Sequence, residues 1–213
     1  MKKIVITGGL GYIGTELCKI YSGYSWNDKI LVIDNRFISE RVNQIRNWNM
    51  DFVQGDVLDK ELIKKYCKDA DIIHHLAGIT SVPRVKSESN KINDKKIIDV
   101  AEKGTRNILD VISDDCKIIL PSSHVVYEGM HKVKSDIKEN EDTLPVLAYG
   151  KSKDINEKQL KASGKKYVIL RLGSVYGYST DTARLDIMAN FFAKLASQDG
   201  VLRLFAGGRQ VKS

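Results

Sequence analysis

Six short apolar runs, rich in β-branched residues, recur along the chain and are separated by stretches with helical spacing. The runs are Lys3–Thr7, Ile30–Asp34, Phe52–Gln54, Ile72–His75, Lys117–Leu120 and Tyr167–Leu172. Continuous apolar runs predict strands buried on both faces, as in a parallel sheet. Between them, stretches such as Lys95–Ile112 repeat apolar residues at helical spacing. This alternation predicts an α/β fold with a doubly wound parallel sheet and right-handed crossovers.

A glycine-rich turn, Thr7–Gly14 (TGGLGYIG), follows the first run directly. Gly8, Gly11 and Gly14 permit a tight turn and let backbone amides approach a pyrophosphate at the positive end of the next helix. Asp34 follows 20 residues after Gly14 and ends the second run, where a carboxylate can bind the ribose hydroxyls of adenosine. The turn therefore predicts a dinucleotide-binding sheet of the Rossmann type.

The residues after the second and third runs bear on the choice of dinucleotide. Asp34 would repel a 2′-phosphate and so favours NAD over NADP, whereas Arg36 argues the other way. Asp56, after Gly55, is placed to meet the adenine edge, and a turn or a helix cap is the alternative interpretation. NAD is the cofactor we expect.

Composition excludes several other classes of protein. Hydrophobic residues make up 42% of the chain and charged residues 29%, an ordinary globular balance. The net charge is +7, but no block of like charges or nucleic-acid motif accompanies it, so we expect no nucleic-acid partner. No apolar run approaches the ~20 residues of a membrane helix. The start of the chain does not read as a signal peptide, and we expect a cytoplasmic protein with no membrane partner.

Cysteine and histidine positions do not favour a metal site. Cys18, Cys67 and Cys116 are far apart and form no CxxC pair. His74 and His75 are adjacent in a predicted strand, so they are expected to point to opposite faces and not to bind one ion together.

Several further motifs occur in a fixed order with the glycine turn. They are Gly55-Asp56-Val57, His75-Leu76-Ala77-Gly78, Ser122–Tyr127, Tyr149-Gly150-Lys151-Ser152-Lys153 and Arg171–Gly177. Together they resemble the extended short-chain dehydrogenase/reductase superfamily, in particular its NAD-dependent nucleotide-sugar epimerases and dehydratases. The resemblance covers essentially the whole chain.

The resemblance implies that Ser123, Tyr149 and Lys153 are catalytic. Tyr149 and Lys153 are four residues apart, so on a helix their side chains are neighbours. The Lys153 ammonium and the positive nicotinamide ring would both favour the Tyr149 phenolate, since a nearby opposite charge can shift a pKa by ~1–3 units. Tyr149 would then take a hydroxyl proton, Lys153 would also hold the nicotinamide ribose, and Ser123 would orient the reacting oxygen. The implied cofactor-binding residues are Gly8, Gly11, Tyr12, Ile13, Gly14, Asp34, Asn35, Asp56, Val57, Leu76, Ala77, Gly78, Tyr149 and Lys153.

The chain also departs from the family pattern. Ala101 and Ser174 stand where many members have asparagine, and the second of these asparagines commonly contacts the substrate nucleotide. His124 follows Ser123 where the 4,6-dehydratases usually have aspartate, which argues against dehydratase chemistry. Ser81-Val82-Pro83-Arg84 resembles a stretch of epimerases that act on acetylated or acidic UDP-hexoses.

Family members are usually longer than this chain, and the difference affects the expected domains. We expect an NAD-binding Rossmann domain over residues 1–173 and the start of a truncated substrate-binding region over 174–213, with the C-terminal substrate domain largely absent. The tail Gly207–Ser213 resembles the family's Gly-x-Gln-x-Arg-Asp stretch, with Lys212 in place of the arginine.

The resemblance implies an NAD-dependent nucleotide-sugar epimerase, acting at C4 of a UDP-hexose by transient hydride transfer to bound NAD. A reductase or dehydrogenase with net redox, and a non-catalytic NAD-binding module, remain alternatives. By the same resemblance, the stretches Lys91–Ile112 and Ala148–Lys161 are expected to form the four-helix bundle of a homodimer.

Overall fold

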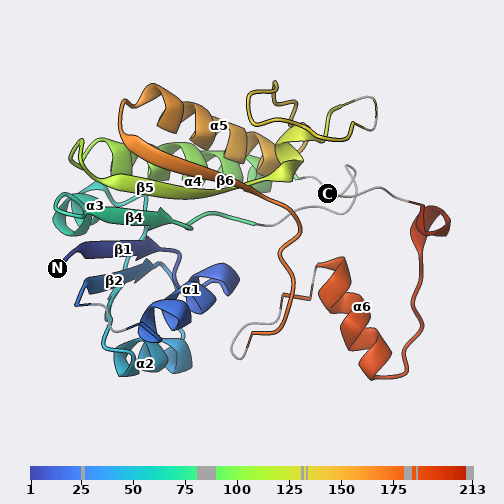
Figure 1. Cartoon of the computed structure of the whole chain (residues 1–213), viewed down its shortest axis with the longest axis horizontal. Helices are drawn as coiled ribbons and strands as arrows, with labels where there is room; N and C mark the ends of the chain where they lie inside the picture. Colours follow the sequence, from blue (N-terminus) through green and yellow to red (C-terminus); the bar gives the residue numbers. More distant parts are fainter. Residues whose placement is uncertain are drawn as a thin grey trace.

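Six parallel strands form one sheet with helices on both faces (Figure 1). The computed structural model describes residues 1–24, 27–80, 90–130, 132, 134–179, 184–185 and 187–209. The strands are β1 (Lys3–Thr7), β2 (Lys29–Asp34), β3 (Asp51–Gln54), β4 (Ile72–His75), β5 (Lys117–Ser123) and β6 (Lys166–Leu172). The helices are α1 (Tyr12–Ser22), α2 (Ser39–Asn47), α3 (Lys60–Cys67), α4 (Lys91–Leu109), α5 (Ala148–Ala162) and α6 (Met188–Ser197), with the 3₁₀ turns η2 (His124–Tyr127) and η3 (Phe205–Gly208).

The sheet has the order β3-β2-β1-β4-β5-β6, and every neighbouring pair of strands is parallel. The order reverses between β1 and β4, where a doubly wound sheet opens a crevice at the carboxyl ends of its strands. The predicted Rossmann-type α/β fold is therefore confirmed.

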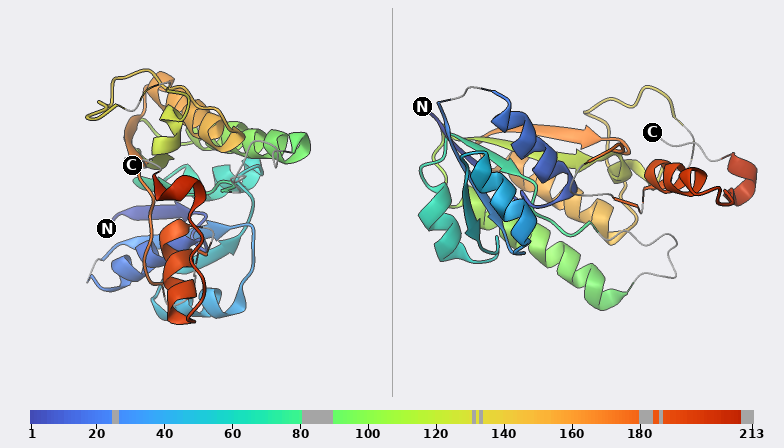
Figure 2. Two further views of the ribbon diagram at one scale, coloured as in Figure 1. Left: turned by 90° about the vertical axis from the view of Figure 1, so that its right-hand side faces the viewer. Right: turned by 90° about the horizontal axis from the view of Figure 1, so that it is seen from below.

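The hydrophobic core lies in two layers, one on each face of the sheet. In β1, Val5 belongs to the layer under α3, α4 and α5, whereas Ile4 and Ile6 belong to the layer under α1 and α2. Figure 2 shows α4 and α5 side by side on the first face, with α1 and α2 on the other. The central strands are thus buried on both faces, as their continuous apolar runs predict.

β5 extends past the run that predicts it, through Pro121 to Ser123. Its pairing with β4 ends at Ile119, whereas its pairing with β6 continues to Ser123. Proline has no N–H to donate, so it is tolerated where only one neighbouring strand is paired. This extension carries Ser123 to the carboxyl edge of the sheet.

β6 differs from the prediction of burial on both faces. It ends the sheet order and pairs only with β5 among the described strands. Tyr167, Val168 and Leu170 are 41%, 38% and 43% exposed, while Ile169 packs on the core. An apolar run predicts a strand but does not reveal how many of its faces are covered.

Beyond β6 the chain leaves the sheet. α6 has no buried residue and stands away from the layers of the sheet in Figure 1. Within the described ranges, no helix is both long and apolar enough to cross a bilayer.

Candidate active site

The residues singled out by the sequence converge on the carboxyl edge of the sheet. The glycine turn follows β1, Asp34 ends β2, and Ser123 ends β5. Tyr149 lies at the start of α5, which packs against β5, β6 and η2. Because all the strands are parallel, their carboxyl ends meet at one edge, so residues far apart in the sequence share this region.

The turn after β1 has a conformation that only glycine tolerates. Gly8 has φ +73°, and its N–H donates to the Ile33 carbonyl at 2.7 Å. A Cβ on Gly8 would lie 2.7 Å from the backbone nitrogen of Ala77, and a Cβ on Gly14 would lie 2.6 Å from the Gly8 carbonyl oxygen. Backbone atoms cannot move away as a flexible side chain does, so these glycines fix the path of the turn.

The turn places the amino end of α1 at the carboxyl edge of the sheet. α1 begins at Tyr12, its N-cap Gly11 provides no side-chain cap, and its first turn contains no acidic residue. Uncapped N–H groups and the helix dipole make such an end suited to an anion. The turn therefore fits the pyrophosphate of a dinucleotide.

Asp34 is buried at the end of β2 and binds the glycine turn. Its Oδ2 accepts from the Leu10 N–H at 3.0 Å, and its Oδ1 accepts from the Arg36 N–H at 3.0 Å. The Arg36 guanidinium also pairs with Asp34, with 3.3 Å between Nε and Oδ1. The positive charge of Arg36, which would favour the 2′-phosphate of NADP, is therefore offset by the Asp34 carboxylate, which would disfavour it.

The expected adenine-side residues have structural partners of their own. Asn35 Nδ2 donates to Asp56 Oδ2 at 3.1 Å, and Asp56 Oδ1 accepts from the Leu58 N–H at 3.0 Å. Asp56 thus makes the turn contact that the sequence left as its alternative role. Val57 is a core residue, 5% exposed, and packs beside Gly104.

The structure brings Ser123, Tyr149 and Lys153 together. Lys153 Nζ lies 5.6 Å from the centroid of the Tyr149 ring and donates to the Pro121 carbonyl at 2.8 Å. The Ser123 hydroxyl accepts from the Val125 N–H at 3.4 Å and is hydrogen-bonded to the Tyr149 phenol. A strand end and the first turns of a helix thus assemble a hydroxyl, a phenol and an amine.

Burial has the largest effect on the pKa values of Tyr149 and Lys153. It raises the pKa of Tyr149, against the opposing effects of the Arg184 charge and the Ser123 hydrogen bond. It lowers the pKa of Lys153 to about 8. In the protein without its cofactor, desolvation therefore outweighs the contacts that favour the Tyr149 phenolate.

The two histidines point to opposite faces of β4, as predicted. His75 is buried, with Thr7 Oγ1 2.9 Å from its Nδ1 and Thr105 Oγ1 3.0 Å from its Nε2. His74 Nε2 lies 2.8 Å from the hydroxyl of Tyr21 on the other face. Burial lowers the pKa of His75 to about 3, so it is neutral and joins β1 to α4 beneath the site.

The first residues of the expected substrate-binding region cross the carboxyl edge after β6. We call residues 174–179 the crossing segment. The Tyr12 hydroxyl donates to the Gly177 carbonyl at 2.7 Å, and Ser179 donates to Glu16 of α1. Asn190 Oδ1 accepts from the Gly177 N–H at 2.9 Å. No local pattern announces these contacts, because their partners are far apart along the chain.

Arg184 is a residue that the sequence did not assign to the site. Its Nη2 donates to the Thr80 carbonyl at 3.2 Å, and its charge acts on the Tyr149 phenol. Two motifs quoted from the sequence, Ser81–Arg84 and the end of the tail at 210–213, lie outside the described residues.

Comparison with protein families and solved structures agrees with this geometry. The NAD dependent epimerase/dehydratase family matches residues 4–212. A relative from Methanocaldococcus jannaschii is 30% identical over 98% of this chain and 68% of its own length. UDP-glucose 4-epimerase of Neisseria meningitidis serogroup C is 30% identical over 80% of this chain and 52% of its own length. The chain thus spans between half and about two thirds of these relatives.

Solved structures are similar over nearly the whole chain. UDP-N-acetylglucosamine 4-epimerase from Methanobrevibacter ruminantium superposes with a TM-score of 0.79 at 27% identity, over 98% of this chain and 67% of that one. UDP-glucuronic acid 4-epimerase from Bacillus cereus, in complex with UDP-glucuronic acid and NAD, gives a TM-score of 0.77 at 25% identity, again over 98% and 67%.

Proposed function

Because this chain belongs to the NAD-dependent epimerase/dehydratase family, we propose that it interconverts UDP-hexoses at C4 by transient hydride transfer to bound NAD. The observation that carries the proposal is the meeting of Ser123, Tyr149 and Lys153 beside the glycine turn. A dinucleotide-binding module has no need of this trio. Relatives and similar structures that act on UDP-sugars at C4 support the same reaction.

The residues around the glycine turn fit the family's cofactor. We propose that Gly8, Gly11 and Gly14 with the amino end of α1 hold the pyrophosphate. Asp34 would hold the adenosine ribose, with Asn35 and Asp56 on the adenine side and Leu76–Gly78 along the ring system. Gly78 supports this placement, since a Cβ there would meet no protein atom within 4 Å.

Ser123, Tyr149 and Lys153 would each have a separate role in the oxidation at C4 and in the reduction that follows. NAD, when bound, supplies the acceptor for the C4 hydride and later returns it. Tyr149 takes the proton of the C4 hydroxyl as phenolate and gives it back when the ketone is reduced from the opposite face. Ser123 donates a hydrogen bond to the reacting oxygen, and the Lys153 ammonium favours the phenolate. No net redox results.

Residues 174–213 are proposed as the beginning of the substrate-binding region, with residues 1–173 as the NAD-binding domain. The crossing segment supports this division because it leaves β6 and runs over the carboxyl edge to α1. A nucleotide sugar held there would face Tyr149 from the side of Arg184.

A homodimer through α4 and α5 is part of the proposal. The two helices form a layer on one face of the sheet (Figure 2). The outward side chains of α4 include the ion pairs Asp99–Lys103 and Glu102–Arg106. A gel-filtration mass that stays at the 23.9 kDa of the monomer would refute the dimer.

We propose a cytoplasmic location on the basis of three free, buried thiols, Cys18, Cys67 and Cys116. Free cysteines are typical of reducing compartments. Subcellular fractionation tests this location.

The test of function is incubation of the chain with NAD and a panel of UDP-hexoses, followed by NMR of the sugar and absorbance of NADH. Formation of the C4 epimer without accumulation of NADH supports the proposal. NADH formed or consumed in proportion to sugar identifies a reductase or dehydrogenase. Binding of NAD by calorimetry with no change in any sugar identifies a binding module.

A further inference from the structure

A buried carboxylate lies on α5 one turn beyond the proposed catalytic pair. Tyr149, Lys153 and Glu157 follow at four-residue intervals, so they share one face of the helix. This is the face that packs on β5 and β6. The Glu157 side chain is only 1% exposed, and both of its oxygens accept hydrogen bonds.

Glu157 joins α5 to both of these strands. Its Oε1 accepts from the Ser122 hydroxyl at 2.5 Å and from Arg171 Nε at 3.0 Å. Its Oε2 accepts from Arg171 Nη2 at 2.6 Å. Ser122 and Arg171 are directly paired across β5 and β6, and Ser122 immediately precedes Ser123. The carboxylate thus holds the strand end that carries the proposed catalytic hydroxyl.

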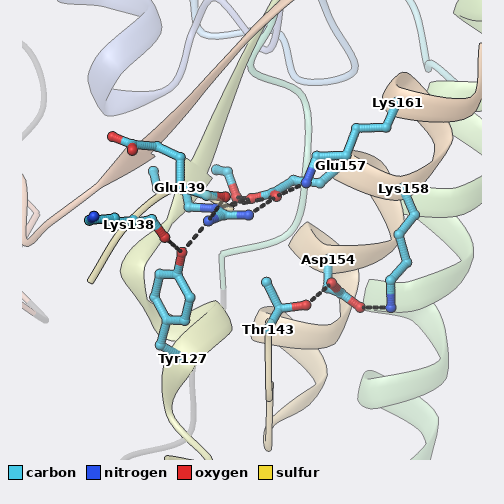
Figure 3. Close-up of polar contacts among 10 residues, drawn as sticks. Tyr127, Lys138, Glu139, Thr143, Asp154, Glu157, Lys158 and Lys161 are labelled. Atoms are coloured by element: carbon cyan, nitrogen blue, oxygen red, sulfur yellow. Dashed lines mark hydrogen bonds and ion pairs between the residues drawn. The ribbon is translucent and has the colours of Figure 1, made fainter. Parts of the chain in front are cut away.

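Arg171 extends the connection to the loop before α5. Its Nη1 donates to the Glu139 carbonyl at 3.0 Å and contacts the Tyr127 hydroxyl, which in turn donates to the Lys138 carbonyl at 3.2 Å. Figure 3 shows this continuous line of contacts from Glu157 to the loop. The pair thus contacts the loop before α5 as well as the strand that carries Ser123.

Stability alone is a poor explanation for this pair. Burial raises the pKa of Glu157, but hydrogen bonds from Arg171 and Ser122 bring it below its ordinary value, so the carboxylate is charged. The Arg171 side chain is 13% exposed. Desolvating two such charges commonly costs as much as their attraction returns. What the pair does provide is orientation, because a guanidinium–carboxylate fork fixes direction as well as distance.

We propose that Glu157 is a positioning residue which, through Ser122 and Arg171, keeps the Ser123 hydroxyl hydrogen-bonded to the Tyr149 phenol. The inference rests on the proposed function of Ser123 and Tyr149. The hydrogen bond between Ser123 and Tyr149 can be observed spectroscopically, without turnover of a substrate.

The experiment observes the phenol directly, by NMR of protein labelled with [¹³Cζ]tyrosine in which the Tyr149 signal is identified by Tyr149→Phe. Four variants are compared with the parent: Ser123→Ala, Glu157→Gln, the double variant and Asp154→Asn. Asp154 is the matched control, because it lies on the same helix but binds Thr143 and Lys158, at 2.6 Å each (Figure 3). Circular dichroism and thermal unfolding establish that each variant is folded.

We expect Glu157→Gln to move the Tyr149 signal in the same direction as Ser123→Ala. In the Glu157→Gln background, Ser123→Ala should then add little, since the hydrogen bond is already lost. Asp154→Asn should leave the signal in place. If Glu157→Gln does not fold, Ser122→Ala takes its part, because it removes one contact to Glu157 and leaves the ion pair intact.

A Tyr149 signal that Ser123→Ala moves, and that both Glu157→Gln and Ser122→Ala leave unchanged, overturns the inference. Where the parent turns over a UDP-hexose, Glu157→Gln should lower kcat and leave the Kd for NAD unchanged. A parent that turns over no UDP-hexose counts against the proposed function, while the NMR comparison still judges the role of Glu157.

Discussion

Replacing Lys153 by methionine should stabilise the protein without its cofactor at pH 7 while removing the proposed catalytic amine. Burial lowers the pKa of Lys153 from 10.5 to about 8, so keeping this ammonium charged at pH 7 costs about 3 kcal/mol. Methionine has a similar length and no charge. The variant loses the hydrogen bond to the Pro121 carbonyl, which offsets about 1–2 kcal/mol. The expected net gain in the free energy of unfolding is about 1–2 kcal/mol.

The direction of the Lys153 pKa shift determines how the free energy of unfolding changes with pH. The folded pKa of Lys153, about 8, lies below the ordinary value of 10.5. Between these values the unfolded chain binds more protons, so the stability of the parent rises with pH in this window. Lys153→Met lacks the titration. Its advantage over the parent should therefore be largest at pH 7 and should shrink by about 2 kcal/mol at pH 9.5.

Urea unfolding of both proteins at pH 7 and pH 9.5 measures the change, and titrations common to both cancel in the difference. Lys158→Met is the matched control on the same helix, because the Lys158 side chain is 70% exposed. A difference between parent and Lys153→Met that is the same at both pH values would refute the reasoning.

Three further predictions concern the cofactor and the base. Tyr149→Phe should leave NAD binding intact by calorimetry and abolish turnover; surviving turnover would mean that another group is the base. Gly78→Ala should keep the thermal midpoint of the parent, since a Cβ there meets no protein atom within 4 Å, but weaken NAD binding about tenfold or more by filling the crevice, a loss of about 1.4 kcal/mol. Asp34→Asn should release Arg36 from its ion pair and reduce the preference for NAD over NADP in paired titrations, because a free guanidinium attracts a 2′-phosphate.

The fold could be predicted from the sequence because its strongest signals are local. Each strand of the central sheet is a continuous apolar run, and Gly8 and Gly14 occupy positions where a Cβ would clash with backbone. The proximity of Tyr149 and Lys153 could also be predicted from the sequence, since residues four apart are neighbours on any helix.

What the sequence did not reveal depends on burial and on distant contacts. The apolar run that predicts β5 ends at Leu120, yet the strand continues to Ser123 because β6 extends beyond β4. The exposed side of β6 follows from its place at the end of the sheet order. In the sequence, Arg171 belongs to a motif and Glu157 to a predicted helix, and nothing local indicates that they form an ion pair. Their pairing depends on which strand lies against α5.

Burial acts on Tyr149 and Lys153 in opposite directions, and the consequence bears on the proposed reaction. It raises the pKa of the phenol and lowers that of the amine to about 8, so at pH 7 the phenol is neutral while the amine is still mostly charged. The Ser123 hydrogen bond and the charge of Arg184 oppose burial at Tyr149 without overcoming it. A further positive charge beside Tyr149 would lower its pKa, and an oxidised nicotinamide, where bound, would supply one. In the proposed reaction, Tyr149 would then be a phenolate before it takes the C4 hydroxyl proton and a phenol until it returns that proton.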